Sequence, residues 1–223
     1  MSRREKFQIG NICHLYNRGS KKDPIFFDIH DYLRFIEILD EFNWEKNLRL
    51  REIREIKKLP ASLKMDFFKK GKRLVKIYCF CLMENHFHLA VKQILEDGIS
   101  LFMKKVNTGY AYYLNKKYNK SGYVFQGRYK SVRVINDSQL VHLTKYIHLN
   151  PIKIISIKKG IDISEALREY PWSSYCDFIG LNKYPHLCKS DIINHWGGVD
   201  EYKKSINIWG KRKIDDLRIK AGF

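Results

Sequence analysis

The segment that most constrains the fold is a run of strand-forming residues interrupted once by two polar residues. Residues 74–83 are rich in β-branched, aromatic and other apolar types, and residues 88–93 continue this pattern soon after Glu84 and Asn85. Such residue types favour strands, and a short polar break between two strands is typical of a tight turn. We therefore predict a β-hairpin over residues 74–93.

Strand and helix patterns alternate on both sides of this hairpin. Helices are indicated by apolar residues at i, i+3, i+4 and i+7, and strands by β-branched and aromatic content between turn-forming residues. This order predicts an α+β fold, a ferredoxin-like or RRM-like antiparallel sheet with helices, followed by an extra helix. The further elements are a strand at 9–16, a helix capped by Asp28, a helix at about 100–118, a strand at 131–135, and a helix that Asn136 or Asp137 caps and Pro151 ends near Asn150.

The chain divides into a main domain and a smaller C-terminal part. Beyond residue 156 the pattern changes to short helices and loops, so we predict a domain at 1–155 and a small helical appendage at 156–223. Within the domain, residues 45–73 carry 11 Lys or Arg against four Asp or Glu, with weak helical spacing broken by Pro60. We interpret this segment as an exposed basic helical insertion.

The charge of the chain points to a polyanionic partner. Forty-two Lys and Arg against 24 Asp and Glu give a net charge of +18, so a nucleic acid is the first partner to consider. No apolar run approaches the ~20 residues that cross a bilayer, and the charged N-terminus lacks the apolar region of a secretory signal. The five cysteines contain no C-x-x-C pair. We therefore expect a cytoplasmic protein without a membrane partner.

Two histidines stand close together after the polar break of the hairpin. His86 and His88 are separated by one residue, and because side chains alternate along a strand, both face the same side. Two imidazoles on one side of a strand can converge on one metal ion, with oxygen ligands completing the shell of Mn²⁺ or Mg²⁺. The alternative is a partly buried polar face without a metal.

The last helix of the domain places a tyrosine between two polar residues. His142, Tyr146 and Asn150 follow one another at intervals of four, so a helix over 137–150 presents all three on one face. A tyrosine in such surroundings can act as a nucleophile when a cation or base activates its phenol. The alternative is a tyrosine that covers the core with its hydroxyl in water.

Two sequence motifs together resemble the single-tyrosine HUH transposases, most closely the REP-associated tyrosine transposases. The first, at 83–91, reads Met-Glu-Asn-His-Phe-His-Leu-Ala-Val, and the second, at 145–153, reads Lys-Tyr-Ile-His-Leu-Asn-Pro-Ile-Lys. The resemblance extends over most of residues 10–180. Further matching segments lie at 16–19, 125–131 and 170–175.

The resemblance implies an enzyme that cuts and joins single-stranded DNA containing hairpins. His86 and His88 would hold a divalent cation, Mg²⁺ or Mn²⁺, against the scissile phosphate. Tyr146 would attack the phosphorus to form a 5′-phosphotyrosine and a free 3′-OH, and Asn150 would complete the metal shell. The helix at 137–150 then becomes the catalytic helix of an HUH single-tyrosine domain.

The first motif departs from the family at Glu84, where many relatives have proline. This puts the rigidity of the turn in doubt but not the ligands, and we expect the Glu84 side chain to point to solvent. His148 lies two residues after Tyr146 on a different face of the helix. We expect it to be structural or to contact DNA.

Basic residues near the motifs are candidates for DNA contacts, with residues 45–73 as a wider field for phosphates. The aromatic residues among them could stack on unpaired bases. The predicted DNA-binding residues are Arg18, Arg128, Lys130 and Arg133, and the predicted stacking residues are Tyr123, Phe125 and Tyr129.

Two other functions remain open from the sequence. A non-catalytic nucleic-acid-binding protein with an RRM-like fold would not need His86, His88 and Tyr146 to converge. A metal-assisted hydrolase with water as nucleophile would leave Tyr146 dispensable. Tyr110 and Tyr113 are rival nucleophiles that fall on an apolar stripe. The DNA target and the oligomeric state, monomer or homodimer, are left open.

Overall fold

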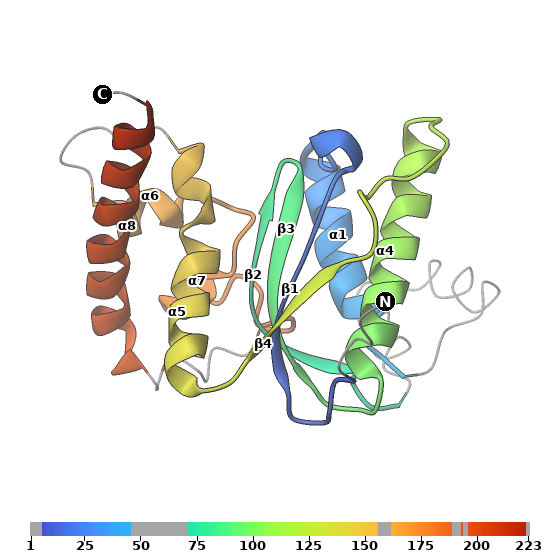
Figure 1. Cartoon of the computed structure of the whole chain (residues 1–223), viewed down its shortest axis with the longest axis horizontal. Coiled ribbons are helices and arrows are strands. Elements are labelled where there is room, and N and C mark those ends of the chain that lie inside the picture. Colours follow the sequence, from blue (N-terminus) through green and yellow to red (C-terminus); the bar gives the residue numbers. More distant parts are fainter. Residues whose placement is uncertain (1–5, 46–70, 156–161, 189–192, 194–195, 222–223) are drawn as a thin grey trace.

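The computed structural model describes residues 6–45, 71–155, 162–188, 193 and 196–221. Its elements form three layers, with an antiparallel sheet between two groups of helices (Figure 1). In chain order the elements are β1 (Ile12–Arg18), the 3-10 turn η1 (Ser20–Lys22), α1 (Ile29–Glu41), β2 (Val75–Met83), β3 (His86–Gln93), α4 (Gly98–Lys117), β4 (Lys130–Val134), α5 (Asp137–His148), the 3-10 turn η2 (Asn150–Lys153), α6 (Ile163–Arg168), α7 (Tyr175–Phe178) and α8 (Val199–Ala221).

The sheet has four strands in the order β2-β3-β1-β4, and every neighbouring pair is antiparallel. The chain order of the first six large elements is β-α-β-β-α-β, which is the ferredoxin-like arrangement. The predicted fold class and the predicted hairpin are therefore confirmed. β1 and β3, which carry residues of the quoted motifs, lie side by side at the centre of the sheet.

One face of the sheet is covered by α1 and α4 (Figure 1). Because side chains alternate along a strand, Leu15 of β1 and Phe87, Leu89 and Val91 of β3 all point to this side and are completely buried. They pack with apolar residues of the two helices. These helical residues include Phe35, Ile38 and Leu39 of α1 and Phe102, Val106 and Tyr110 of α4.

The other face of the sheet is covered by α5 and the helices that follow it (Figure 1). On β2 and β3, Cys79, Cys81 and Ala90 are buried against apolar residues of these helices. Toward β4 this cover ends, and Val132 is more than half exposed. This uncovered part of the face is where the candidate site lies. The helical residues in the second core are Leu140, Ile147, Ile163, Leu167, Tyr175, Phe178, Tyr202 and Ile206.

Two helix starts follow the predicted caps. The Asp28 carboxylate accepts the backbone N–H of Asp31, and Asp31 returns the interaction as a capping box. Asn136 caps α5 through the N–H of Gln139. Each cap satisfies an N–H group that has no partner within its helix, which fixes where the helix begins.

Two sequence predictions require correction. α5 ends at His148, and Asn150 begins the turn η2, because Pro151 cannot continue an α-helix. The C-terminal part holds one long helix, α8, rather than only short ones. Its buried positions Tyr202, Ile206 and Gly210 recur every four residues but are separated by polar residues, so the apolar pattern is weak.

The predicted basic insertion lies almost entirely outside the described residues. Trp44, the residue before it, and Arg73, its last residue, form an antiparallel bridge, so its two ends lie together. The five cysteines are free and buried, as small apolar residues are. Among the described helices, none combines the length and apolar character of a membrane span.

Candidate active site

His86 and His88 project from β3 toward the partly uncovered face of the sheet. In the register with β1, Arg18 is opposite His86 and Tyr16 is opposite His88, so all four side chains share this face. The two imidazole rings have centroids 5.1 Å apart and are nearly perpendicular. The predicted same-side arrangement of the two histidines is therefore present.

Each of these histidines has one ring nitrogen engaged inside the protein. Nδ1 of His86 is 2.7 Å from Oδ1 of Asn85, and Nδ1 of His88 is 2.9 Å from Nε2 of His14. In both rings the engaged nitrogen is Nδ1, which leaves Nε2 for another partner. A second hydrogen bond that fixes the ring and its tautomer is typical of histidines that ligate metals.

The surroundings keep the three histidines neutral. Burial, together with the positive charges of Arg18 and Lys153, lowers the pKa of His86 to about 4. Burial also lowers the pKa of His14 to about 4, and burial with its histidine neighbours lowers the pKa of His88 to about 2. A neutral imidazole has a free lone pair, and this is the form that binds metal ions.

Tyr146 on α5 lies directly beside this histidine group. The centroid of its ring is 5.6 Å from that of His88 and 5.8 Å from that of His14, with edge-to-face geometry in both pairs. The side chain remains 48% exposed, so a substrate can reach it. Burial and the nearby Tyr16 raise the pKa of Tyr146, which keeps the phenol protonated at neutral pH.

Asn150 is held at the end of the same helix. Its Nδ2 donates to the carbonyl oxygen of Tyr146 at 2.9 Å, and only 5% of the residue is exposed. The hydrogen bond orients the amide although Asn150 stands in η2 and not in α5. With Nδ2 engaged, Oδ1 is the atom of this side chain that can act as a ligand.

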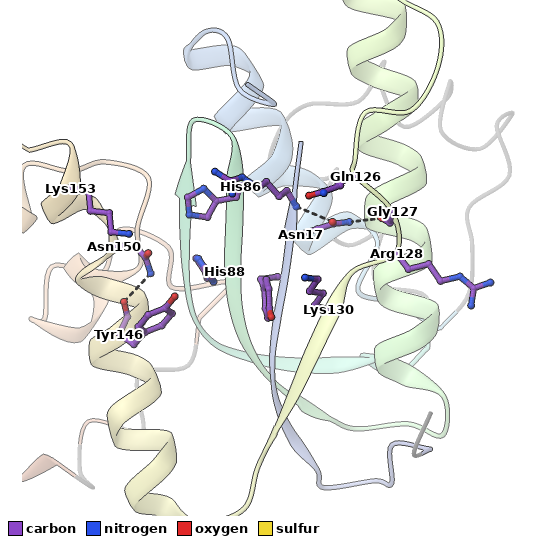
Figure 2. Close-up of a pocket in the computed structure, with 12 residues that line it drawn as sticks. Asn17, His86, His88, Gln126, Gly127, Arg128, Lys130, Tyr146, Asn150 and Lys153 are labelled. Atoms are coloured by element: carbon purple, nitrogen blue, oxygen red, sulfur yellow. Dashed lines mark hydrogen bonds between the residues drawn. The ribbon is translucent and has the colours of Figure 1, made fainter. Parts of the chain in front are cut away.

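His86, His88, Tyr146 and Asn150 line one pocket of about 520 Å³ in the described part of the chain. Figure 2 shows Tyr146, Asn150 and Lys153 on one side of it, facing His86 and His88 on β3. No lining residue is acidic, so the pocket favours an anion such as a phosphate. The lining residues are Tyr16, Asn17, Arg18, His86, His88, Gln126, Gly127, Arg128, Lys130, Tyr146, Asn150 and Lys153.

The four predicted DNA-binding residues divide into three groups. Arg18 and Lys130 line the pocket and share its face of the sheet. Arg128 borders the pocket, but its side chain extends away from the histidines (Figure 2). Arg133 pairs with Cys13 in the register, so it points to the opposite face of the sheet. Lys130 and Arg133 are three residues apart on β4, so alternation along the strand puts their side chains on opposite faces.

The predicted stacking residues also differ in where they lie. Tyr123 is 93% exposed, in the loop before β4. The prediction that Phe125 stacks on a base is wrong. Phe125 is buried against Phe87 and Tyr110, so its ring has no free face for a base. Tyr129 is partly buried against the same core.

Three polar residues near the motifs lie outside the pocket. His142 contacts the ring of Trp209 on α8, although Tyr146 is only one turn away. The Glu84 side chain is exposed at the hairpin turn, as expected, while its carbonyl accepts from the backbone N–H groups of Ile25 and Phe26. His148 is fully buried, and its Nε2 is 2.9 Å from Oγ of Ser174, so it is structural and cannot contact DNA.

The rival tyrosines belong to the helical layer behind the sheet. Tyr110 is completely buried, and its hydroxyl donates to the carbonyl of Ile25. Tyr113 donates to Asp31. Both lie on α4, across the sheet from the histidines, so neither can meet a phosphate held in the pocket.

Four neighbours of the site were not predicted from the sequence: His14, Asn17, Lys153 and Lys213. A signal for His14 exists, because His14, Tyr16 and Arg18 alternate along one strand and share a side. That signal does not say which strand pairs with β1, so only the register shows that His14 meets His88. Lys213 comes from α8, and no local pattern links it to Tyr146.

The donor atoms of the pocket fit a divalent cation bound together with a phosphate. Two neutral imidazoles and one amide oxygen could provide three protein ligands, which would leave positions for phosphate oxygens or water. No group of three or more His, Cys, Asp and Glu side chains suited to a metal occurs among the described residues. A cation here would therefore depend on oxygen ligands from outside the protein.

The fold and the pocket define a class: a ferredoxin-like α+β protein with a histidine pair facing a tyrosine in a basic pocket. Residues 63–150 match the profile of the family described as "Transposase IS200 like". The match contains both His86–His88 and Tyr146–Asn150, which confirms the resemblance predicted from the two motifs. No curated protein matches the chain.

A solved structure shares the fold. It is described as a REP-associated tyrosine transposase bound to a REP hairpin. The two structures have a TM-score of 0.52 at 15% sequence identity, over 86% of this chain and 92% of that one. Because the sequence identity is low, the likeness shows a shared fold only. Its coverage of this chain extends beyond residues 63–150 of the family match.

Proposed function

We propose that this protein is a metal-dependent transposase that cuts and rejoins single-stranded DNA through a tyrosine nucleophile. The observation that carries the proposal is the meeting of Tyr146 with His86 and His88 in one basic pocket. In this proposal residues 1–155 form the catalytic domain. The five buried free cysteines support action in a reducing compartment, the cytoplasm.

His86, His88 and Asn150 are the residues that would hold the cation, Mg²⁺ or Mn²⁺. A bound cation would act as a Lewis acid that neutralises charge on the phosphate oxygens. His14 and Asn85 keep the two imidazole rings oriented through their hydrogen bonds to Nδ1. The hydrogen bond of Asn150 to the Tyr146 carbonyl holds the amide, so all three proposed ligand side chains are oriented before DNA binds.

In the proposed reaction Oη of Tyr146 attacks the scissile phosphorus. A phosphorus–oxygen bond forms to Tyr146, the bond to the 3′ oxygen breaks, and the leaving oxygen takes up the proton that the phenol loses. The products are a 5′-phosphotyrosine and a free 3′-OH. Because the energy of the broken bond is kept in the covalent link, attack by another 3′-OH reverses the step and joins two strands.

The basic pocket supports a nucleic acid as the substrate. Arg18, Lys130 and Lys153 surround the histidines, and no acidic residue lines the pocket within the described ranges. The similar solved structure is bound to a REP hairpin. We therefore propose single-stranded DNA with hairpin structure as the substrate.

The proposal is tested by incubating the protein with end-labelled single-stranded hairpin DNA and Mn²⁺ or Mg²⁺. A covalent protein–DNA adduct that survives denaturing electrophoresis and depends on the cation is the expected product. DNA binding without cleavage would favour the non-catalytic nucleic-acid-binding alternative. Cleavage that leaves a free 5′-phosphate and no adduct would favour a hydrolase with water as nucleophile.

A further inference from the structure

Lys213 of α8 contacts the end of the helix that carries Tyr146. Its Nζ donates to the carbonyl oxygen of Leu149 at 2.9 Å, and Leu149 is the C-terminal cap of α5. The same Nζ lies 5.5 Å from the centroid of the Tyr146 ring. One ammonium therefore contacts both the last turn of α5 and the proposed nucleophile.

The position of this lysine suits its charge. Carbonyl groups in the last turn of a helix have no partners within the helix, and the helix dipole makes that end negative. A cation over an aromatic ring is attracted by the electrons of the ring. Both interactions of Lys213 are favourable, although burial and the neighbouring Lys153 lower the pKa of Lys213 to about 8.

The packing of α8 brings Lys213 to this position. Gly210 lies one turn earlier on the same side of α8, and a Cβ added there would stand 2.8 Å from Cγ2 of Ile163 and 3.2 Å from Cδ1 of Ile152. Isoleucine is branched at Cβ and adapts poorly, so a larger residue at 210 would push α8 away. The glycine allows the close approach that puts Lys213 against Leu149.

We propose that Lys213 is a positioning residue, through which the C-terminal helix fixes the Tyr146 ring relative to His86 and His88. The inference rests on the proposed function, because it assigns a partner to the proposed nucleophile. It also gives a role to a helix that lies beyond the family match at residues 63–150. Removing the ammonium frees the ring and the last turn of α5, while the alkyl stem continues to fill its space.

The test uses Lys213→Met, which keeps the stem, and Lys213→Arg, which keeps the charge. Lys211→Met is the matched control, since Lys211 is exposed on the same helix. 3-Fluorotyrosine at position 146 reports the surroundings of the ring by ¹⁹F NMR without DNA or metal. We expect a shifted or broadened resonance in Lys213→Met, a resonance near that of the parent in Lys213→Arg, and no change in Lys211→Met.

The second measurement is the single-turnover rate of adduct formation on hairpin DNA with Mn²⁺. A misplaced nucleophile lowers rates on the order of 10- to 100-fold, so Lys213→Met should lose this much while its DNA affinity is unchanged. Gly210→Ala should move the fluorine resonance as well, which provides a second variant if Lys213→Met folds poorly.

An unchanged fluorine resonance in Lys213→Met would overturn the inference, and so would an equal rate loss in Lys211→Met. If the parent protein forms no adduct, the proposed function fails. The fluorine measurement still decides whether Lys213 positions the ring.

Discussion

Nε2 of His14 lies 2.9 Å from Nδ1 of His88, and the two residues come from neighbouring strands. This contact determines where the protons are if His88 ligates a metal through Nε2. Nδ1 of His88 must then carry the proton and donate it, so Nε2 of His14 must accept, and the proton of the neutral His14 ring is on its Nδ1.

Replacing His14 should therefore weaken metal binding. His14→Phe keeps a flat ring but removes the acceptor, and the loss of such a partner typically lowers metal affinity 10- to 100-fold. Isothermal titration calorimetry with Mn²⁺ measures this change in metal affinity directly. His142→Phe is the control, because His142 lies outside the pocket. Equal Mn²⁺ affinity in His14→Phe and the parent protein would show that this hydrogen bond does not orient a ligand.

Tyr146→Phe should abolish the covalent adduct with little effect on stability. The substitution removes one oxygen from a half-exposed ring, so the free energy of unfolding should change by no more than ~1 kcal/mol. Adduct formation on labelled DNA and urea unfolding check the two parts. Tyr112→Phe should retain activity, since Tyr112 is exposed on α4, across the sheet. An adduct in Tyr146→Phe would place the nucleophile elsewhere.

Lys130 and Arg133 of β4 provide a comparison between the two faces of one strand. Lys130 lines the pocket, whereas Arg133 points to the other face. Each lost phosphate contact with a single strand reduces the log–log salt slope of binding by about 0.7. Lys130→Ala should show this change in anisotropy titrations at several salt concentrations, and Arg133→Ala should not. Equal changes would indicate a diffuse field of charge instead of a defined DNA path.

Asp31 should make the stability of the α1–α4 layer depend on pH. Burial opposes its ionisation, but hydrogen bonds from Lys117, the Phe27 N–H and Tyr118 outweigh burial and lower the pKa of Asp31. A carboxyl whose pKa is lower in the folded than in the unfolded protein stabilises the folded state at pH values above its unfolded pKa, which is near 3.8. This stabilisation is lost as the pH falls through the folded pKa.

The Asp31→Asn variant tests this pH dependence. It should lower the free energy of unfolding by about 1.5–3 kcal/mol at pH 7, because charged hydrogen bonds are lost. The difference from the parent protein should shrink as the pH approaches 3. Urea titrations at several pH values measure it. A difference that stays constant with pH would show that the charge of Asp31 contributes nothing.

The fold could be predicted from the sequence because its signals are local. The hairpin at 74–93 follows from residue type and a polar turn, and the caps at Asp28 and Asn136 follow from single side chains. Alternation along a strand also placed His86 and His88 on one side. The long helix α8 was missed because its buried positions are few and lie between polar residues.

By itself, the sequence determined the strands and helices of the ferredoxin-like part, the strand faces and the spacing of Tyr146 and Asn150, since these depend on neighbours a few residues away. Tertiary structure decided which residues meet. Strand register brings His14 to His88, and the close packing at Gly210 brings Lys213 to Tyr146. Such contacts join residues far apart in the chain. They are set by packing of the sheet and helices as a whole, which no local pattern records.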